Sequence, residues 1–105
     1  MAELKVVERV KGCADLFYQN SKQAAYESLA GLLSELNGQL QELIGLLGRL
    51  PGGAGETMQQ KVLADLRELV TAYQCKDGLA LADLLCYDIL EELNLLEELK
   101  QGAAQ

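Results

Sequence analysis

The sequence predicts an all-α protein, and three observations lead to this fold class. The good helix formers Ala, Leu, Glu, Gln and Lys dominate the 105 residues. β-branched residues are few, and there is a single Pro. Apolar residues recur at steps of three and four, which is typical of amphipathic helices. A chain of this length forms one small domain, so we expect residues 1–105 to be a single helical domain.

The first expected helix covers about residues 3–19, and the second covers about residues 21–49. In the second, leucines follow an unbroken alternation of three and four steps over several heptads. With about 100° per residue, the apolar stripes of the two helices point in different directions. We therefore expect a break near Asn20 and Ser21, with Asn20 and Gln23 as a capping box. The stripe of the first helix consists of Val6, Val10, Cys13 and Phe17.

Glycines mark two further features of this region. Gly31, Gly38 and Gly45 recur every seven residues, away from the leucine seam. They indicate either a smooth groove for another helix or tolerated surface glycines. Residues 48–56, GRLPGGAGE, form a loop, because Pro and Gly end helices. This loop lacks the spacing of a phosphate-binding loop, and we interpret it as a connector.

The third helix is expected at about residues 57–75, with Thr57 and Gln60 as a second capping box. The fourth is expected at about residues 78–100, where Asp77 is well suited to cap its start. Short, longer and short connections between the helices predict an up-down four-helix bundle. The alternative is a pair of helical hairpins that complete a bundle by dimerisation.

The fourth helix has apolar residues on nearly all of its sides. A surface helix of a monomer has a single apolar stripe, so this helix is either central or lends a second face to another chain. Aromatic residues concentrate at interfaces, and Tyr87 with Leu90 is the predicted anchor pair. The equal alternative is a tyrosine at the edge of its own core. The full predicted interface consists of Asp83, Leu84, Tyr87, Leu90, Asn94 and Leu95.

Little in the composition points to catalysis or metal binding. The chain has no His, which removes the commonest general base and the usual zinc sites. Asp88 with Glu92, and Glu91 with Glu98, each share a helix face, but lone surface carboxylate pairs rarely hold a metal. No calcium-binding loop is present. We expect no catalytic residue, no metal and no cofactor, and hence a protein that is not an enzyme.

The three cysteines are an odd number without C-x-x-C spacing, which indicates a reducing compartment. Cys13 and Cys86 lie in or beside apolar stripes and are interpreted as packing residues. Cys75, next to Lys76, is the best candidate for a reactive thiol. The chain opens without the pattern of a signal peptide and has no run of about 20 apolar residues. We therefore expect a cytoplasmic protein.

The net charge of −7 argues against nucleic acid and against anionic membranes as partners. Residues 77–105 carry seven acidic residues and one basic residue. This acidic end is either a partner surface or a solvated face that favours solubility.

The stretch from Lys76 to Leu90 also carries a resemblance. Its residues Lys76-Asp77, Leu79, Leu81-Ala82-Asp83-Leu84-Leu85 and Tyr87-Asp88-Ile89-Leu90 resemble a motif of small uncharacterised bacterial helical proteins. That group is associated with flagellated Gram-positive bacteria. The resemblance implies a helical, non-enzymatic protein in a motility setting, similar in general character to the small acidic export chaperones of the flagellar system.

Together these observations predict a chaperone-like or adaptor protein that binds a partner helix through its fourth helix, by helix-in-groove packing. The first alternative is a homodimer with a structural role. The second is a small-ligand-binding protein or enzyme.

Overall fold

The computed structural model describes residues 6–104, and this part of the chain is helical and contains no strand. The all-α prediction is therefore confirmed. The predicted start of the first helix at residue 3 lies outside the described residues. The elements are α1 (Val6–Tyr18), α2 (Lys22–Gly48), the 3-10 turn η1 (Pro51–Gly53), α3 (Glu56–Gln74), α4 (Gly78–Asp83), the π-helical turn η2 (Leu84–Ile89) and α5 (Leu90–Ala104). Because α4, η2 and α5 are continuous, we refer to them together as the last helix.

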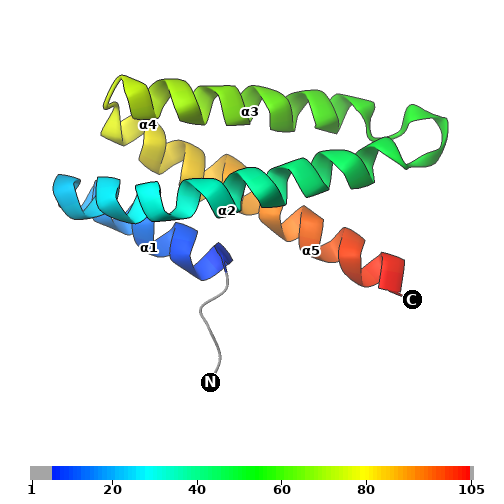
Figure 1. Ribbon diagram of the computed structural model, residues 1–105, viewed down its shortest axis with the longest axis horizontal. Coiled ribbons are helices and arrows are strands. Elements are labelled where there is room, and N and C mark those ends of the chain that lie inside the picture. Colours follow the sequence, from blue (N-terminus) through cyan, green and yellow to red (C-terminus); the bar gives the residue numbers. More distant parts are fainter. Residues whose placement is uncertain (1–5, 105) are drawn as a thin grey trace.

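The helices form a flat molecule. α2 and α3 lie side by side and run in opposite directions, and the last helix crosses α2 diagonally (Figure 1). α1 folds back along α2 and also contacts α4. The described part measures 44 × 35 × 19 Å, and the shortest dimension holds only two layers of helices. A two-layer molecule leaves one side of each helix open to solvent.

Asn20 ends α1 and separates it from α2. Its φ of 64° is left-handed, its N–H bonds to the carbonyl of Phe17, and the N–H of Ser21 bonds to that of Leu16. These two bonds make a Schellman motif, in which Asn is tolerated at the left-handed position. Ser21 precedes α2 without a side-chain capping bond. The expected capping box of Asn20 and Gln23 was therefore wrong, although the break itself lies where the sequence predicted it.

The turn between α3 and α4 also contains a left-handed residue, Lys76, whose φ is 57°. A left-handed conformation costs a non-glycine residue about 1–2 kcal/mol. The Lys76 ammonium lies 4.7 Å from the ring centre of Tyr26 and 5.0 Å from that of Tyr73, and cation–π attraction offsets this cost. The carboxylate of Asp77 then accepts a hydrogen bond from the N–H of Ala80, at 3.1 Å. The predicted Asp77 cap is confirmed.

The start of α3 depends on Gly55 rather than on Thr57. Gly55 precedes the helix, and no side chain caps it, so the expected capping box of Thr57 and Gln60 was wrong. A Cβ atom at Gly55 would lie 2.4 Å from the carbonyl oxygen of Leu47, at the end of α2. Only glycine lets the two backbones approach this closely.

The core runs along α2 and the last helix. The leucine seam predicted for α2 faces inward, and its central members are fully buried. They pack with the stripe of the last helix and with Val10, Cys13 and Phe17 of α1. The buried residues of the last helix are Leu81, Ala82, Leu84, Leu85, Ile89, Glu92, Leu93 and Leu96.

Candidate functional site

The last helix is the central element, because it contacts α1, α2 and α3. Its apolar residues lie on several sides since different helices cover those sides. Between Leu84 and Ile89 the turns widen, and the N–H of Leu90 bonds to the carbonyl of Leu85, five residues earlier. Such π-helical turns are rare and occur frequently at functional sites. Two features of interest lie on this helix: an outward surface and a charged cluster.

The structure distributes the six residues of the predicted interface between surface and core. Asp83, Tyr87 and Asn94 are exposed. Leu90 and Leu95 are half-buried and pack against the core. Leu84 differs from the sequence-based expectation, because it is only 4% exposed and belongs to the core. Whether these residues contact a partner stays a prediction.

The outward side of the last helix carries two large apolar side chains. Leu79 is 68% exposed and Tyr87 is 66% exposed. Asp83 lies between them in the sequence, one turn from each, and accepts a hydrogen bond from the hydroxyl of Tyr18 in α1. This hydrogen bond raises the pKa of Tyr18. We call Leu79, Asp83 and Tyr87, with Tyr18 beside them, the last-helix surface.

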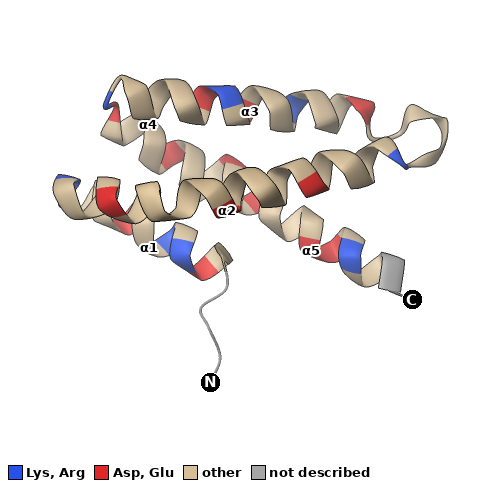
Figure 2. Cartoon of the chain, in the orientation of Figure 1, with Lys and Arg blue, Asp and Glu red and all other residues tan. Residues whose placement is uncertain are grey.

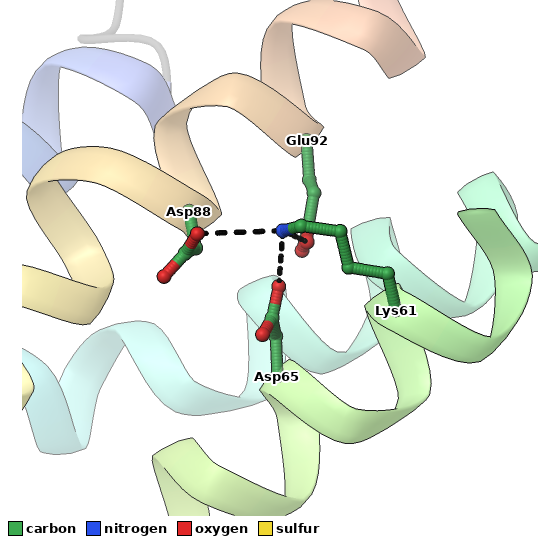
Figure 3. Close-up of polar contacts among 4 residues, drawn as sticks. All are labelled: Lys61, Asp65, Asp88 and Glu92. Carbon is green, nitrogen blue, oxygen red and sulfur yellow. Dashed lines mark hydrogen bonds and ion pairs between the residues drawn. The ribbon is translucent and has the colours of Figure 1, made fainter. Parts of the chain in front are cut away.

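A charged cluster joins α3 to the last helix (Figure 3). The Lys61 ammonium lies 2.9 Å from a carboxylate oxygen of Asp65, 3.3 Å from one of Asp88 and 3.1 Å from one of Glu92. Partial burial acts to lower the pKa of Lys61, but its hydrogen bonds to Asp65 and Glu92 outweigh this effect and raise it. Three carboxylates therefore share one ammonium, and the cluster has an excess of negative charge when all are ionised.

Glu92 is the most unusual member, because it is fully buried. One of its oxygens meets Lys61, and the other, Oε1, has no hydrogen-bond partner. Burial and the neighbouring Asp65 raise the pKa of Glu92 from 4.5 to about 8, against the opposing effect of Lys61. Since ionising a buried carboxyl is costly, Glu92 holds a proton at neutral pH. A protonated Glu92 can donate a hydrogen bond, and the neighbouring Asp65 carboxylate is the group that can accept it.

Sequence reasoning missed Lys61 and Asp65, and it treated Asp88 and Glu92 as a lone surface pair. One signal was present: Glu92 falls between Ile89 and Leu93, at the edge of the apolar stripe. Lys61, the cation that contacts Glu92, lies 31 residues away in the sequence on another helix, so the pairing could not be read from the pattern of one helix. In the described part of the chain, no group of three or more His, Cys, Asp or Glu side chains is arranged to hold a metal ion. The lysine ammonium occupies the centre of this cluster instead.

The three cysteines are free and differ in exposure. Cys13 is buried, and burial raises the pKa of its thiol, which suits a packing residue. Cys86 is half-buried beside the core, and Cys75 is exposed at the end of α3.

A groove runs along the outer seam between α2 and α3, with a volume of about 540 Å³. The glycine row lies on the outward side of α2 next to this seam, and a Cβ atom at Gly31, Gly38 or Gly45 would meet nothing within 4 Å. No other helix of the described chain covers these glycines. The residues that line the groove are Asn37, Gln41, Leu63, Leu66, Arg67, Val70 and Thr71. We call this the α2–α3 groove.

Charge is unevenly arranged over the molecule. Lys and Arg residues are scattered over several helices and do not gather on one face, whereas acidic residues follow one another along the last helix (Figure 2). Among residues 6–104, no helix combines the length and the apolar character that crossing a membrane requires.

Comparison of the chain with protein-family models, with curated proteins and with solved structures finds no match.

Proposed function

We propose that the protein is a non-enzymatic interaction module, chaperone-like or an adaptor, that binds a helical segment of a protein partner through its last helix. The observation that carries this proposal is the exposure of Leu79 and Tyr87 on a helix whose opposite side is fully buried. Burying a large apolar side chain stabilises a complex by about 1.5–3 kcal/mol, so two such residues supply a binding anchor. The core fixes the backbone of this helix, so binding would order only the two side chains and not the chain itself.

The neighbouring charges favour a partner with basic residues. Asp83 lies between the two apolar residues, and the exposed Glu91 follows one turn after Tyr87. Carboxylates at the rim of an apolar contact set specificity and association rate more than affinity. Within this proposal the helices form an up-down bundle, the protein works in the cytoplasm, and nucleic acid and membranes are not its partners.

Substitution at the last-helix surface tests this function. Tyr87→Ala and Leu79→Ala are expected to weaken capture of the physiological partner, because hot-spot truncations cost about 2 kcal/mol or more. Gln60→Ala, at an exposed position of α3 outside both the last-helix surface and the α2–α3 groove, is the control. Unchanged capture by the Tyr87→Ala and Leu79→Ala variants would contradict the proposal.

Self-assembly is the second candidate, since a two-layer molecule with exposed apolar residues on both α3 and the last helix has surface available for its own copies. Sedimentation equilibrium separates the two functions. A monomer at all working concentrations excludes the structural homodimer. A dimer that Tyr87→Ala dissociates would show that the last-helix surface is covered by a second copy.

A further inference from the structure

The α2–α3 groove contains apolar surface that the fold does not use. Leu63 is 37% exposed and Val70 is 49% exposed. With Leu66 between them, they follow steps of three and four along α3. Val62 and Leu69 are buried in the core, and Leu66 packs partly against it. Leu63 and Val70 therefore extend the apolar side of α3 beyond the part that the core covers.

The groove is also electrostatically unlike the rest of the molecule. Arg67 is the one charged residue among those that line it. The chain has 16 acidic and nine basic residues, and none of the residues that line this groove is acidic. The ion pairs among the described residues involve Arg9, Lys61 and Lys100, not Arg67. Arg67 therefore presents an unpaired guanidinium directly beside exposed Leu63 and Val70.

The dimensions of the groove suit a helix. Leu63 and Val70 are seven residues apart, which corresponds to about 10 Å along α3, or two helical turns. On the opposite wall Asn37 and Gln41 are one turn apart and uncharged. Gly38 and Gly45 beside them carry no side chain and leave open space. Because no side chains project from Gly38 and Gly45, a third helix can approach the α2 backbone closely on this side.

We propose that the α2–α3 groove docks an amphipathic helix of a protein partner, whose apolar residues cover Leu63, Leu66 and Val70 and whose carboxylate pairs with Arg67. Arginine binds a carboxylate through two parallel hydrogen bonds, which fixes the register of the docked helix. A second copy in two-fold symmetry fits less well, because the same groove would face itself and its lining offers no carboxylate to Arg67. This surface lies apart from the last-helix surface, and the proposal does not rest on the function proposed above.

The test uses the full chain and two synthetic amphipathic helical peptides. Both carry leucines at steps of three and four, and one has Glu where the other has Lys, at the position expected to face Arg67. Amide chemical shifts of the isotope-labelled protein report where each peptide binds. We expect the Glu peptide to shift resonances of residues 37–41 and 63–71 and to bind at least about tenfold more tightly than the Lys peptide.

Charge reversal sharpens the test. Arg67→Glu is expected to weaken binding of the Glu peptide by about tenfold or more and to strengthen binding of the Lys peptide, while Lys22→Glu, a charge reversal at an exposed position outside the groove, leaves both affinities unchanged. Both changes are at exposed positions, and circular dichroism checks that the variants fold. Equal binding of the two peptides, no binding of either, or shifts confined to residues 79–94 would overturn the proposal. Self-association that Leu63→Ser abolishes would also overturn it, in favour of a second copy.

Discussion

The two edges of α3 meet their neighbours in opposite ways. Along one edge, the Lys61 ammonium closes the seam with the last helix by its contacts to Asp88 and Glu92, and it also pairs with Asp65 of its own helix. Along the other edge, Leu63 and the residues after it leave the seam with α2 open as a groove. Both edges belong to one amphipathic helix of 19 residues. A polar cluster covers one edge, and apolar side chains remain uncovered at the other.

The difference shows that polarity alone does not indicate which surface of a helix is free. The closed seam buries Glu92 completely and leaves its Oε1 without a partner, which costs stability. The open seam exposes leucine and valine to water, which also costs free energy. A buried polar cluster is weak evidence for stability, and in some proteins such groups are retained because they specify one packing arrangement. We infer that the Lys61 cluster fixes the register between α3 and the last helix.

The largest expected effect is the pH dependence of the closed seam. Glu92 has a folded-state pKa of about 8 against an ordinary value of 4.5, so the folded protein binds more protons than the unfolded chain in this interval. Its contribution is favourable below pH 4.5 and is lost as the pH rises towards 8, by up to about 1.4 kcal/mol per pH unit. Urea unfolding at a series of pH values measures this slope.

The matched variant for this prediction is Glu92→Gln, which keeps the shape of the side chain and removes the titration. We expect its free energy of unfolding to be nearly independent of pH between 5 and 8, and to exceed that of the wild type at the upper end. Identical pH profiles for wild type and variant would show that Glu92 is ionised in the folded protein at neutral pH.

Removing the cation from the same seam has the next largest effect. Lys61→Met leaves Asp65 and Glu92 without their ammonium, and breaking such a partly buried cluster costs about 3 kcal/mol. The control is Lys100→Met, since Lys100 pairs with Glu42 at 3.5 Å on the open surface and exposed pairs are worth less than about 1 kcal/mol. Chemical denaturation measures the free energy of unfolding of both variants. Equal losses of stability would contradict a larger contribution from the Lys61 cluster than from an exposed ion pair.

The end of the α2–α3 seam gives a third prediction. Gly55→Ala brings a Cβ atom to 2.4 Å from the Leu47 carbonyl oxygen, and the backbone shift that follows is expected to cost about 2 kcal/mol. Gly38→Ala is the matched control, because a Cβ there meets nothing within 4 Å and Ala favours a helix by about 1 kcal/mol. We expect the melting temperature to fall for Gly55→Ala and to rise for Gly38→Ala. An unchanged melting temperature for Gly55→Ala would show that the loop between α2 and α3 adjusts to the extra Cβ atom without loss of stability.

The smallest effect is expected in the open seam. Leu63→Ser and Val70→Ser change side chains that are already substantially exposed, so stability should change by about 0.5 kcal/mol or less. The same substitution at buried Leu69 serves as the comparison and is expected to cost several-fold more. A large loss at Leu63 or Val70 would mean that the groove is closed in solution.

Part of the candidate site was readable from the sequence. Tyr87 and Asp83 were singled out from the helical wheel, and both lie on the surface. Leu84 was grouped with them because it falls away from the main stripe, but it is buried, and both α1 and α3 contact this segment of the last helix. The wheel assigns directions relative to one helix axis, and it contains no information about how many neighbours surround that helix.

The sequence by itself determined the helices and the place of the first break. The leucine seam of α2 predicted its buried side, and the different stripe directions predicted the separation of α1 from α2, because helical periodicity is a local property. The structure places the ends elsewhere in detail: the left-handed Asn20 and the close approach at Gly55 replace both expected capping boxes.

Tertiary structure alone decided which side chains meet across helices. Lys61 reaches Glu92 over 31 residues of sequence, and the π-helical turn between Leu84 and Ile89 interrupts a stretch that reads as regular helix. Packing also decided that Leu63 and Val70 remain open while Val62 and Leu69 are buried. These outcomes depend on how α2 and α3 cross the last helix. The periodicity of a single helix shows which of its sides is apolar, but it does not determine how that helix crosses its neighbours.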